Sequence, residues 1–257
     1  IWVWERTFDP KSDFAGSIMH RPACAEAVGL VNYDLNRAAK EVTAIQQAPT
    51  PIVLLSSTSS LVKSIGHSDC VMKLYTALAF TGVKTGFVTE RQLEDGILPN
   101  AKVLMVPNAI YLSAKAMETL QKFPGKIVLV GSDNVLTMDE YNKPLPAVSG
   151  ASRISFTSSS TWQSIWNALL PKLADWGTNP QVTLKDAKGL PIWGVEWREA
   201  TTKNGLVVNL SNMRNVKVTI NLQRNGKPAK FVDVLTGKTV SGKLTLEPME
   251  ISLLKSK

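Results

Sequence analysis

The stretch Val103-Leu104-Met105-Val106, followed directly by Pro107-Asn108-Ala109-Ile110, decides the fold. A short run that is apolar at every position predicts a strand buried on both faces, as in a parallel sheet covered by helices. Similar runs occur at residues 52–55, 87–88 and 126–130. Together they predict a parallel α/β sheet over the middle of the chain.

Helical spacing between these runs agrees with that prediction. Ser68 is expected to cap a helix that ends before Gly82, and Ser113 to cap a second helix. A third helix is expected over residues 161–176. The apolar positions of the three helices are Val71, Leu74, Tyr75, Leu78, Ala79, Met117, Leu120, Ile165, Leu169, Leu170 and Leu173.

From about residue 179 the hydrophobic period changes to two. Val218, Ile220 and Leu222 alternate with polar residues, and Asn225-Gly226 is a strong signal for a hairpin turn. Further turns are expected at residues 236–237 and 241–242. This pattern predicts a small antiparallel β-sandwich with one wet face on each sheet.

The beginning of the chain contains a different unit. Ile1-Trp2-Val3-Trp4 has the pattern of a buried strand, which needs neighbours on both edges. Pro22 suits a helix start, and apolar residues recur at helical spacing as far as Ile45. One strand and one helix cannot bury their own faces, so we expect the chain to be the downstream part of a longer protein.

These segments divide the chain into three expected domains: residues 1–48, 49–177 and 178–257, with a Pro-rich linker after the first. Hydrophobic residues make up 44% of the 257 residues and charged residues 19%, which is typical of globular proteins. No apolar run approaches the length of a membrane span. Cys24 and Cys70 fit no metal spacing, and two buried thiols are favoured over a disulfide. The cellular compartment stays open.

The formal net charge is +8, but Lys and Arg are scattered along the chain. No dense basic run and no patch with interleaved aromatic residues occurs, so a nucleic-acid partner is not expected. An acidic polysaccharide would also suit a basic surface, and this alternative stays open.

The α/β segment lacks the phosphate-binding and catalytic motifs that are common in parallel α/β sheets. The turn after its first strand, residues 56–60, contains only Ser and Thr and none of the glycines of a phosphate loop, so a polar loop is expected there. The topology is similar to that of glutamine amidotransferases, whose nucleophile lies on a sharp turn after a strand, yet residues 107–110 contain neither Cys nor Ser. His67 has no evident acid–base partner in the sequence. With two histidines and no ligand spacing, neither metal nor cofactor is expected.

Carboxylates and tryptophans near the start of the chain are candidates for sugar chemistry. Glu5, Glu26 and Asp34 are candidate partners in glycoside hydrolysis, but we expect Glu26 and Asp34 to be solvated and Glu5 to form a salt bridge. Trp2 and Trp4 share a strand face, and an indole ring can stack on the apolar face of a sugar. Packing in a core is the alternative for both tryptophans.

Three segments in order resemble the back half of a family 42 glycoside hydrolase. The first is Trp2-Val3-Trp4-Glu5-Arg6 with Phe14-Ala15-Gly16-Ser17 and the helix to Ile45. The second is residues 103–113. The third is Asp233-Val234-Leu235-Thr236-Gly237 with Val240, Gly242, Leu244 and Leu246-Glu247-Pro248.

The resemblance implies the last βα unit of a TIM barrel, a flavodoxin-like trimerisation domain and a C-terminal β-domain. It implies a retaining, β-galactosidase-like hydrolase that forms a homo-trimer and needs no cofactor. The catalytic glutamates of the family lie on earlier barrel strands, so this chain alone is expected to be inactive. The saccharide would be held through the missing barrel, with Trp2, Trp4, Arg6 and Phe14 as substrate-binding candidates.

One departure from the family concerns the sugar. The barrel-end loop of the galactosidases carries a Glu and a His around its aromatic residue, whereas this chain has Ser12 and Ala15 at those places. The resemblance therefore does not specify galactose. The alternative function is a non-catalytic carbohydrate-binding or oligomerisation module.

Overall fold

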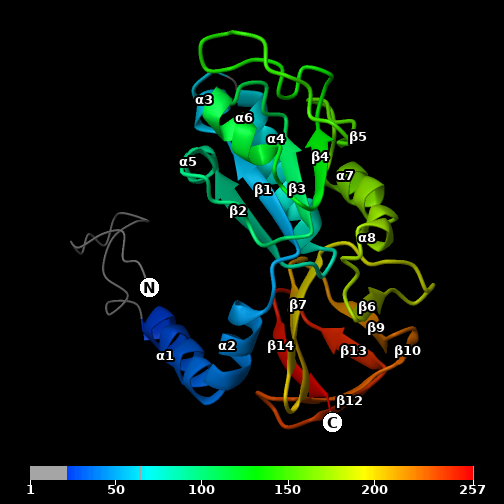
Figure 1. Ribbon diagram of the computed structural model, residues 1–257. Helices are drawn as coiled ribbons and strands as arrows, with labels where there is room; N and C mark the ends of the chain where they lie inside the picture. Colours follow the sequence, from blue (N-terminus) through cyan, green and yellow to red (C-terminus); the bar gives the residue numbers. More distant parts are fainter. Residues whose placement is uncertain (1–21, 64, 257) are drawn as a thin grey trace, which may run out of the picture.

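The computed structural model describes residues 22–63 and 65–256. In Figure 1 a parallel α/β part lies above an antiparallel β part, and helices α1 and α2 lie beside the lower part. This arrangement confirms the predicted fold class for the described residues. The predicted Trp strand lies outside them, as do Trp2, Trp4, Arg6 and Phe14.

The parallel sheet contains five strands in the order β2-β1-β3-β4-β5. This is the flavodoxin-like order, with β1 and β3 central and buried on both faces. Four of the strands match the predicted apolar runs, and β5 is an additional short edge strand. The strands are β1 (Ile52–Ser56), β2 (Thr85–Thr89), β3 (Val103–Pro107), β4 (Lys126–Val130) and β5 (Ser152–Ile154).

Helices cover both faces of this sheet. On one face α4 (Ile65–Ala79), α7 (Trp162–Leu169) and α8 (Lys172–Asp175) pack over a core that includes Leu74 and Trp166. On the other face α5 (Glu90–Glu94) and α6 (Ala114–Leu120) pack over a core that includes Leu104 and Met117. Short helix α3 (Thr58–Lys63) follows β1 directly.

Three of the predicted helix boundaries were wrong. Helix α4 begins at Ile65, so Ser68 lies inside it and does not cap it. The helix expected over residues 161–176 is split before α8, where Pro171 removes a backbone N–H. In the polar loop expected at residues 56–60, Ser56 ends β1 and residues 58–60 begin α3.

The N-terminal helix is also split. It begins at Pro22 as predicted, but α1 (Pro22–Arg37) and α2 (Ala39–Gln47) are separated at Ala38, which is buried. Helix α2 packs on the β part, where Val42 and Ile45 contact Val207 and Leu253. Helix α1 has no buried residue, and its exposed large apolar side chains are Leu30, Val31, Tyr33 and Leu35.

The antiparallel part is one hydrogen-bonded sheet that folds over a single core. Its path is β10-β9-β13-β12-β11-β14-β8-β7, and β6 pairs with the other edge of β9. Alternate residues along its strands point into the same hydrophobic core, which includes Trp197, Leu210, Ile220 and Phe231. The strands are β6 (Val182–Lys185), β7 (Val195–Thr202), β8 (Gly205–Asn212), β9 (Val218–Arg224), β10 (Lys227–Pro228), β11 (Lys230–Asp233), β12 (Thr239–Ser241), β13 (Lys243–Leu246) and β14 (Ile251–Ser256).

Aromatic residues join the two parts. Trp193 lies just before β7, and its ring packs edge-on against Phe80 and Trp166 at centroid distances of 4.5 and 5.5 Å. Gly82, with φ of +77°, lies so close to Trp197 that a Cβ there would overlap the indole ring. The α/β part and the β part are therefore in close contact at these residues.

Within the described ranges, no helix combines the length and the apolar character needed to cross a membrane.

Candidate functional site

The carboxyl edge of the parallel sheet is the first place to look for function, because open α/β sheets bind ligands there. After β3 the chain turns sharply at Asn108, whose φ is +45°. The Asn108 N–H donates a hydrogen bond of 2.6 Å to the carbonyl of Val130 in β4. A sharp turn after a strand is where a nucleophile elbow carries its nucleophile, but the side chain at this position is an amide.

His67 on α4 lies beneath this edge and is fully buried. Its Nε2 accepts a hydrogen bond of 3.0 Å from the Ser57 N–H, and its Nδ1 lies 2.5 Å from the Pro107 carbonyl oxygen. These partners require a neutral ring that donates from Nδ1. Burial lowers the pKa of His67, more than the Pro107 carbonyl and the nearby Glu90 raise it. Both ring nitrogens are therefore used to join the ends of β1 and β3.

Glu90, the first residue of α5, is the centre of the polar cluster at this edge. Glu90 is 3% exposed, and its carboxylate accepts hydrogen bonds from the Ser59 N–H at 2.8 Å and the Ser113 N–H at 2.7 Å. The hydroxyls of Ser57 and Ser59 donate to it at 3.1 and 2.7 Å. Glu90 thus lies where the beginnings of α3, α5 and α6 meet.

This position explains why the edge lacks a phosphate loop. Helix N-termini in such sheets attract anions because their first N–H groups are unpaired and their dipoles are positive at that end. Here the chain's own carboxylate takes those N–H groups. The cluster is therefore internally satisfied, and a bound phosphate would have to displace Glu90.

The serines expected in a polar loop complete the cluster. Ser60 Oγ donates to the Tyr111 carbonyl at 2.7 Å and accepts from the Tyr111 N–H at 3.0 Å. Ser57 Oγ accepts from the Ser60 N–H at 3.0 Å. These bonds tie α3 to the loop after β3, so the hydroxyls have partners within the chain.

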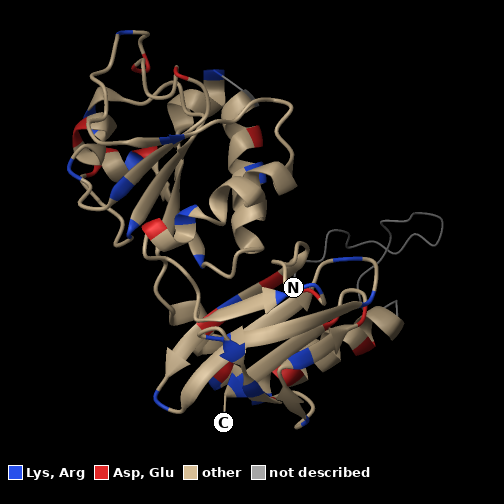
Figure 2. Ribbon diagram, turned by 90° about the vertical axis from the view of Figure 1, so that its right-hand side faces the viewer, with Lys and Arg blue, Asp and Glu red and all other residues tan. Residues whose placement is uncertain are grey.

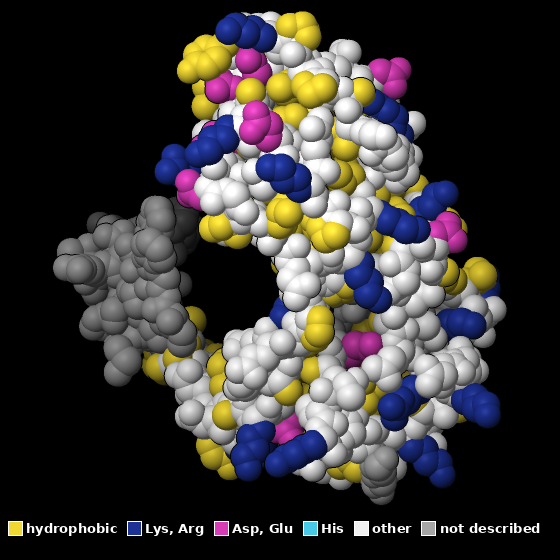
Figure 3. Space-filling model, in the orientation of Figure 1, with side chains coloured by type: hydrophobic (Ala, Val, Ile, Leu, Met, Phe, Trp, Pro, Cys, Tyr) yellow, Lys and Arg dark blue, Asp and Glu magenta, His cyan; other side chains and the backbone are white. Residues whose placement is uncertain are grey.

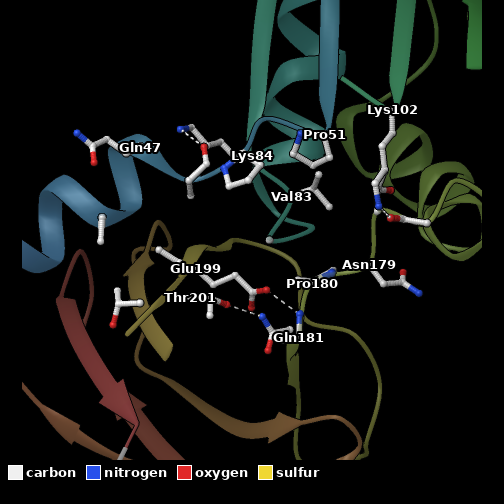
Figure 4. Close-up of a pocket in the computed structure, with 18 residues that line it drawn as sticks. Gln47, Pro51, Val83, Lys84, Lys102, Asn179, Pro180, Gln181, Glu199 and Thr201 are labelled. Atoms are coloured by element: carbon white, nitrogen blue, oxygen red, sulfur yellow. Dashed lines mark hydrogen bonds between the residues drawn. The ribbon is translucent and has the colours of Figure 1, made fainter. Parts of the chain in front are cut away.

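A second candidate is a cavity of about 800 Å³ between α2, the opposite edge of the parallel sheet and the β part. Figure 4 shows Lys84, Lys102, Gln181, Glu199 and Thr201 around it. The ammonium groups bind chain carbonyls: Lys84 that of Ala48 at 2.7 Å, and Lys102 that of Gly177 at 2.6 Å. Burial lowers the pKa of Lys84, and the charge of Arg198 lowers it further.

Glu199 of β7 supplies the cavity's carboxylate. It accepts hydrogen bonds from the backbone N–H groups of Gln181 and Val182 at 2.7 and 2.9 Å. Burial raises the pKa of Glu199, and the two hydrogen bonds and Arg224 only partly offset that effect. Its partners are again groups of the chain, so this cavity is lined by residues that hold the three segments together.

The catalytic options within the described part of the chain are accordingly few. No group of three or more His, Cys, Asp or Glu residues among residues 22–63 and 65–256 has the arrangement of a metal site. Glu26 and Asp34 lie on the exposed helix α1, and Asp34 forms an ion pair with Arg37 at 2.8 Å that was not predicted. Cys24 and Cys70 are free thiols, but the expectation that both are buried is wrong for Cys24, which is exposed on helix α1. Cys70 is buried, and burial raises its pKa to about 12.

Sequence reasoning missed Glu90 and Glu199. The one signal for Glu90 was Thr89 with Gln92 three positions on, which forms a capping box at the start of α5. Nothing in the spacing along the chain brings Glu90 to Ser57 or Ser113. Trp2, Trp4, Arg6 and Phe14 lie outside the described residues, so their role in a sugar site stays a prediction.

The chain resembles known proteins in its fold and not in its sequence. No family model matches the chain, and no curated protein matches its sequence. Solved structures match it over nearly its full length. A GH42 exo-carrageenase from Bacteroides ovatus is 23% identical with a TM-score of 0.76, and the match covers 96% of this chain and 34% of that chain.

Two β-galactosidases show the same relationship. The catalytic mutant of the GH42 enzyme Gan42B from G. stearothermophilus is 11% identical with a TM-score of 0.73, over 98% of this chain and 47% of that chain. The β-galactosidase from Bacillus circulans sp. alkalophilus is 13% identical with a TM-score of 0.67, over 98% and 49%. The chain has the fold of the GH42 C-terminal region.

The fold expected from the resemblance to family 42 is thus confirmed. The chain spans between a third and a half of the length of these structures. Sequence identities of 11–23% show that the fold is shared, but they do not show the activity, the substrate or the assembly of this chain.

Proposed function

We propose that this chain is the C-terminal part of a retaining, β-galactosidase-like glycoside hydrolase, in which it supports assembly and completes the substrate cleft. The observation that carries the proposal is the match of almost the whole chain to about half or less of each GH42 structure. In this proposal residues 1–48 form the last unit of the barrel, 49–177 a trimerisation domain and 178–257 a β-domain.

Helix α1 supports this role. It has no buried residue, while Leu30 and Val31 are 59% and 54% exposed. An apolar helix face of this kind normally packs against another element. In a complete barrel it would cover the outside of the terminal strands, and Trp2, Trp4, Arg6 and Phe14 would lie at the saccharide.

The filled site at Glu90 and the amide at Asn108 favour an assembly role for the α/β part over amido or acyl transfer. Its two candidate catalytic positions are an elbow without a nucleophile and a carboxylate already bound by N–H and O–H donors. A homo-trimer of the intact protein is the assembly that the family resemblance implies.

The test compares the intact protein with the 257-residue chain. Aryl β-galactosides and sulfated galactans are offered to both, and light scattering measures the mass of the intact protein. We expect hydrolysis and a trimer from the intact protein and no hydrolysis from the chain alone. Turnover by the purified chain, or an intact protein that is an inactive monomer, would contradict the proposal.

The alternative, a non-catalytic carbohydrate-binding module, is favoured by one observation, the polar outer face of the β part. A chain that binds saccharide tightly while the intact protein hydrolyses none would support it.

A further inference from the structure

Lys and Arg are spread along the sequence, but the excess of positive over negative charge lies in one part of the molecule. Residues 178–257 contain 13 Lys and Arg against 6 Asp and Glu, a net charge of +7 out of the chain's +8. Figure 3 shows Lys and Arg side chains along the side of the β part where Figure 1 places β9 and β10. The α/β part and the helices before it are nearly neutral by comparison.

Pairing of β6, β9 and β13 builds a continuous outer face there. Lys185 of β6 and Lys243 of β13 lie directly opposite Asn221 of β9, one on each side. Residues opposite each other point to the same face, and neighbouring strands are about 4.8 Å apart, so the two lysines are separated by about 10 Å across the sheet. Their neighbours Leu184, Ile220 and Leu246 point inward and are buried.

The remaining side chains of this face are hydroxyls and amides. Thr183 lies opposite Gln223, and Thr219 lies opposite Thr245 with their hydroxyls 2.9 Å apart. Asn221 is held in place because its Nδ2 donates to the Asp186 carbonyl at 2.7 Å. We call Thr183, Lys185, Thr219, Asn221, Gln223, Lys243 and Thr245 the basic sheet face. Figure 2, in which the right-hand side of Figure 1 faces the viewer, shows blue Lys and Arg segments and some red Asp and Glu segments on the strands of the β part.

The two lysines of the basic sheet face have no anionic partner. Among the described residues, no carboxylate lies within ion-pair distance of Lys185 or Lys243. The nearby acidic groups are occupied: Glu247 pairs with Lys217 at 2.6 Å, and Asp186 accepts from the Lys188 and Leu190 N–H groups. Two unpaired cations therefore flank a row of neutral hydrogen-bonding groups.

We infer that the basic sheet face binds an anionic, sulfated or carboxylated, polysaccharide. The inference rests on the proposed function in taking the partner to be a saccharide, and it adds the charge class. Lysines about 10 Å apart suit acidic groups that recur along a sugar chain, and threonine, asparagine and glutamine side chains suit its hydroxyls. The face has no aromatic side chain on which nucleic-acid bases could stack, which disfavours a single-stranded nucleic acid.

The experiment is a calorimetric titration of the 257-residue chain at low and moderate salt. The probes are a sulfated galactan hexasaccharide, the same hexasaccharide after desulfation, and a single-stranded DNA oligomer of equal charge. The variant Lys185→Gln/Lys243→Gln is compared with Lys115→Gln/Lys122→Gln, which removes two exposed lysines from the region of α6. Thermal melts verify that both variants are folded.

We expect the sulfated probe to bind, the desulfated probe to bind far more weakly, and added salt to weaken binding. The Lys185/Lys243 variant should lose about tenfold in affinity, as expected for two surface charge contacts, while the control variant binds like the parent chain. Equal losses in both variants, no binding of the sulfated probe, or equal binding of DNA would overturn the inference. Hydrolysis by the intact protein is a separate readout, so its failure would count against the proposed function and leave this binding result standing.

Discussion

The Glu90 carboxylate accepts a hydrogen bond of 2.7 Å from the backbone N–H of Ser113, the residue that caps α6. The two residues belong to different βα units, and the bond links the beginnings of α5 and α6. Because the same carboxylate also binds Ser57 and Ser59, one buried side chain orients three helices at the carboxyl edge of the sheet.

The first prediction concerns that carboxylate. Glu90→Gln replaces one acceptor oxygen with an NH₂ group that faces N–H and O–H donors, so we expect unfolding to become easier by about 3 kcal/mol. Urea denaturation followed by circular dichroism measures the change. Glu118→Gln on the exposed face of α6 is the matched control and should change stability by less than about 0.5 kcal/mol. Equal effects of the two substitutions would show that the Glu90 cluster is not a stabilising centre.

The second prediction is a pH dependence from His67. Burial lowers its folded-state pKa below the ordinary value of 6.5, so the unfolded chain binds the proton more readily. The stability that the neutral ring contributes is complete above the unfolded pKa and is lost as pH falls below it, by at most about 1.4 kcal/mol per pH unit.

The measurement is the free energy of unfolding of the parent chain between pH 7.5 and 5, chosen to span the ordinary His pKa of about 6.5. His67→Gln should flatten the curve over this range. The sequence has only one other histidine, His20, so His20→Gln is the natural comparison and should leave the His67 contribution in place. A curve that is unchanged by His67→Gln would contradict a buried neutral ring.

The third prediction concerns the contact between the two parts. Gly82 and Gly96 both have φ of +77°, but a Cβ at Gly82 would overlap the Trp197 indole, whereas nothing lies within 4 Å of one at Gly96. Gly96→Ala therefore reports backbone strain alone, about 1 kcal/mol. Gly82→Ala should cost about 2 kcal/mol more because the packed interface must shift. Differential scanning calorimetry compares the two variants, and equal melting temperatures would contradict the packing seen at Trp197.

The fourth prediction concerns Trp2 and Trp4 in the intact protein. If either lines a saccharide cleft, its replacement by Ala should lower kcat/KM about fivefold, the equivalent of one aromatic contact of about 1 kcal/mol, with little change in melting temperature. Trp162 on α7 is 53% exposed, so Trp162→Ala is a control expected to leave both unchanged. Parallel losses of stability and turnover at Trp2 and Trp4 would identify them as core residues.

The strands were the most predictable part of the fold. A strand such as Val103–Pro107 is buried on both faces, and burial of that kind leaves an apolar run that is visible in the sequence. Asn225-Gly226 likewise marked its turn, because both residues have positive φ and few residue types adopt it.

Helix boundaries and the polar site were less predictable. Helix α3 begins in a run of Ser and Thr that has low helix propensity, and tertiary hydrogen bonds such as Ser60 to Tyr111 stabilise it. Glu90 meets Ser57 and Ser113 across 33 and 23 positions of the chain. Contacts between residues so far apart in the sequence depend on how the sheet and the helices pack, and local periodicity does not encode that packing.

The side-chain bridge from Glu199 to Gln181 and Val182 has a consequence for self-association. Strands β6 and β7 are edges of the β part, and an open edge presents backbone N–H groups on which a strand of another molecule can add. Glu199 occupies two of those N–H groups, and the Trp197 indole N–H donates to the Val182 carbonyl at 3.1 Å. At Gln181 and Val182 these backbone groups already have partners within the chain, so pairing with a strand of a second molecule is disfavoured at this point of the edge.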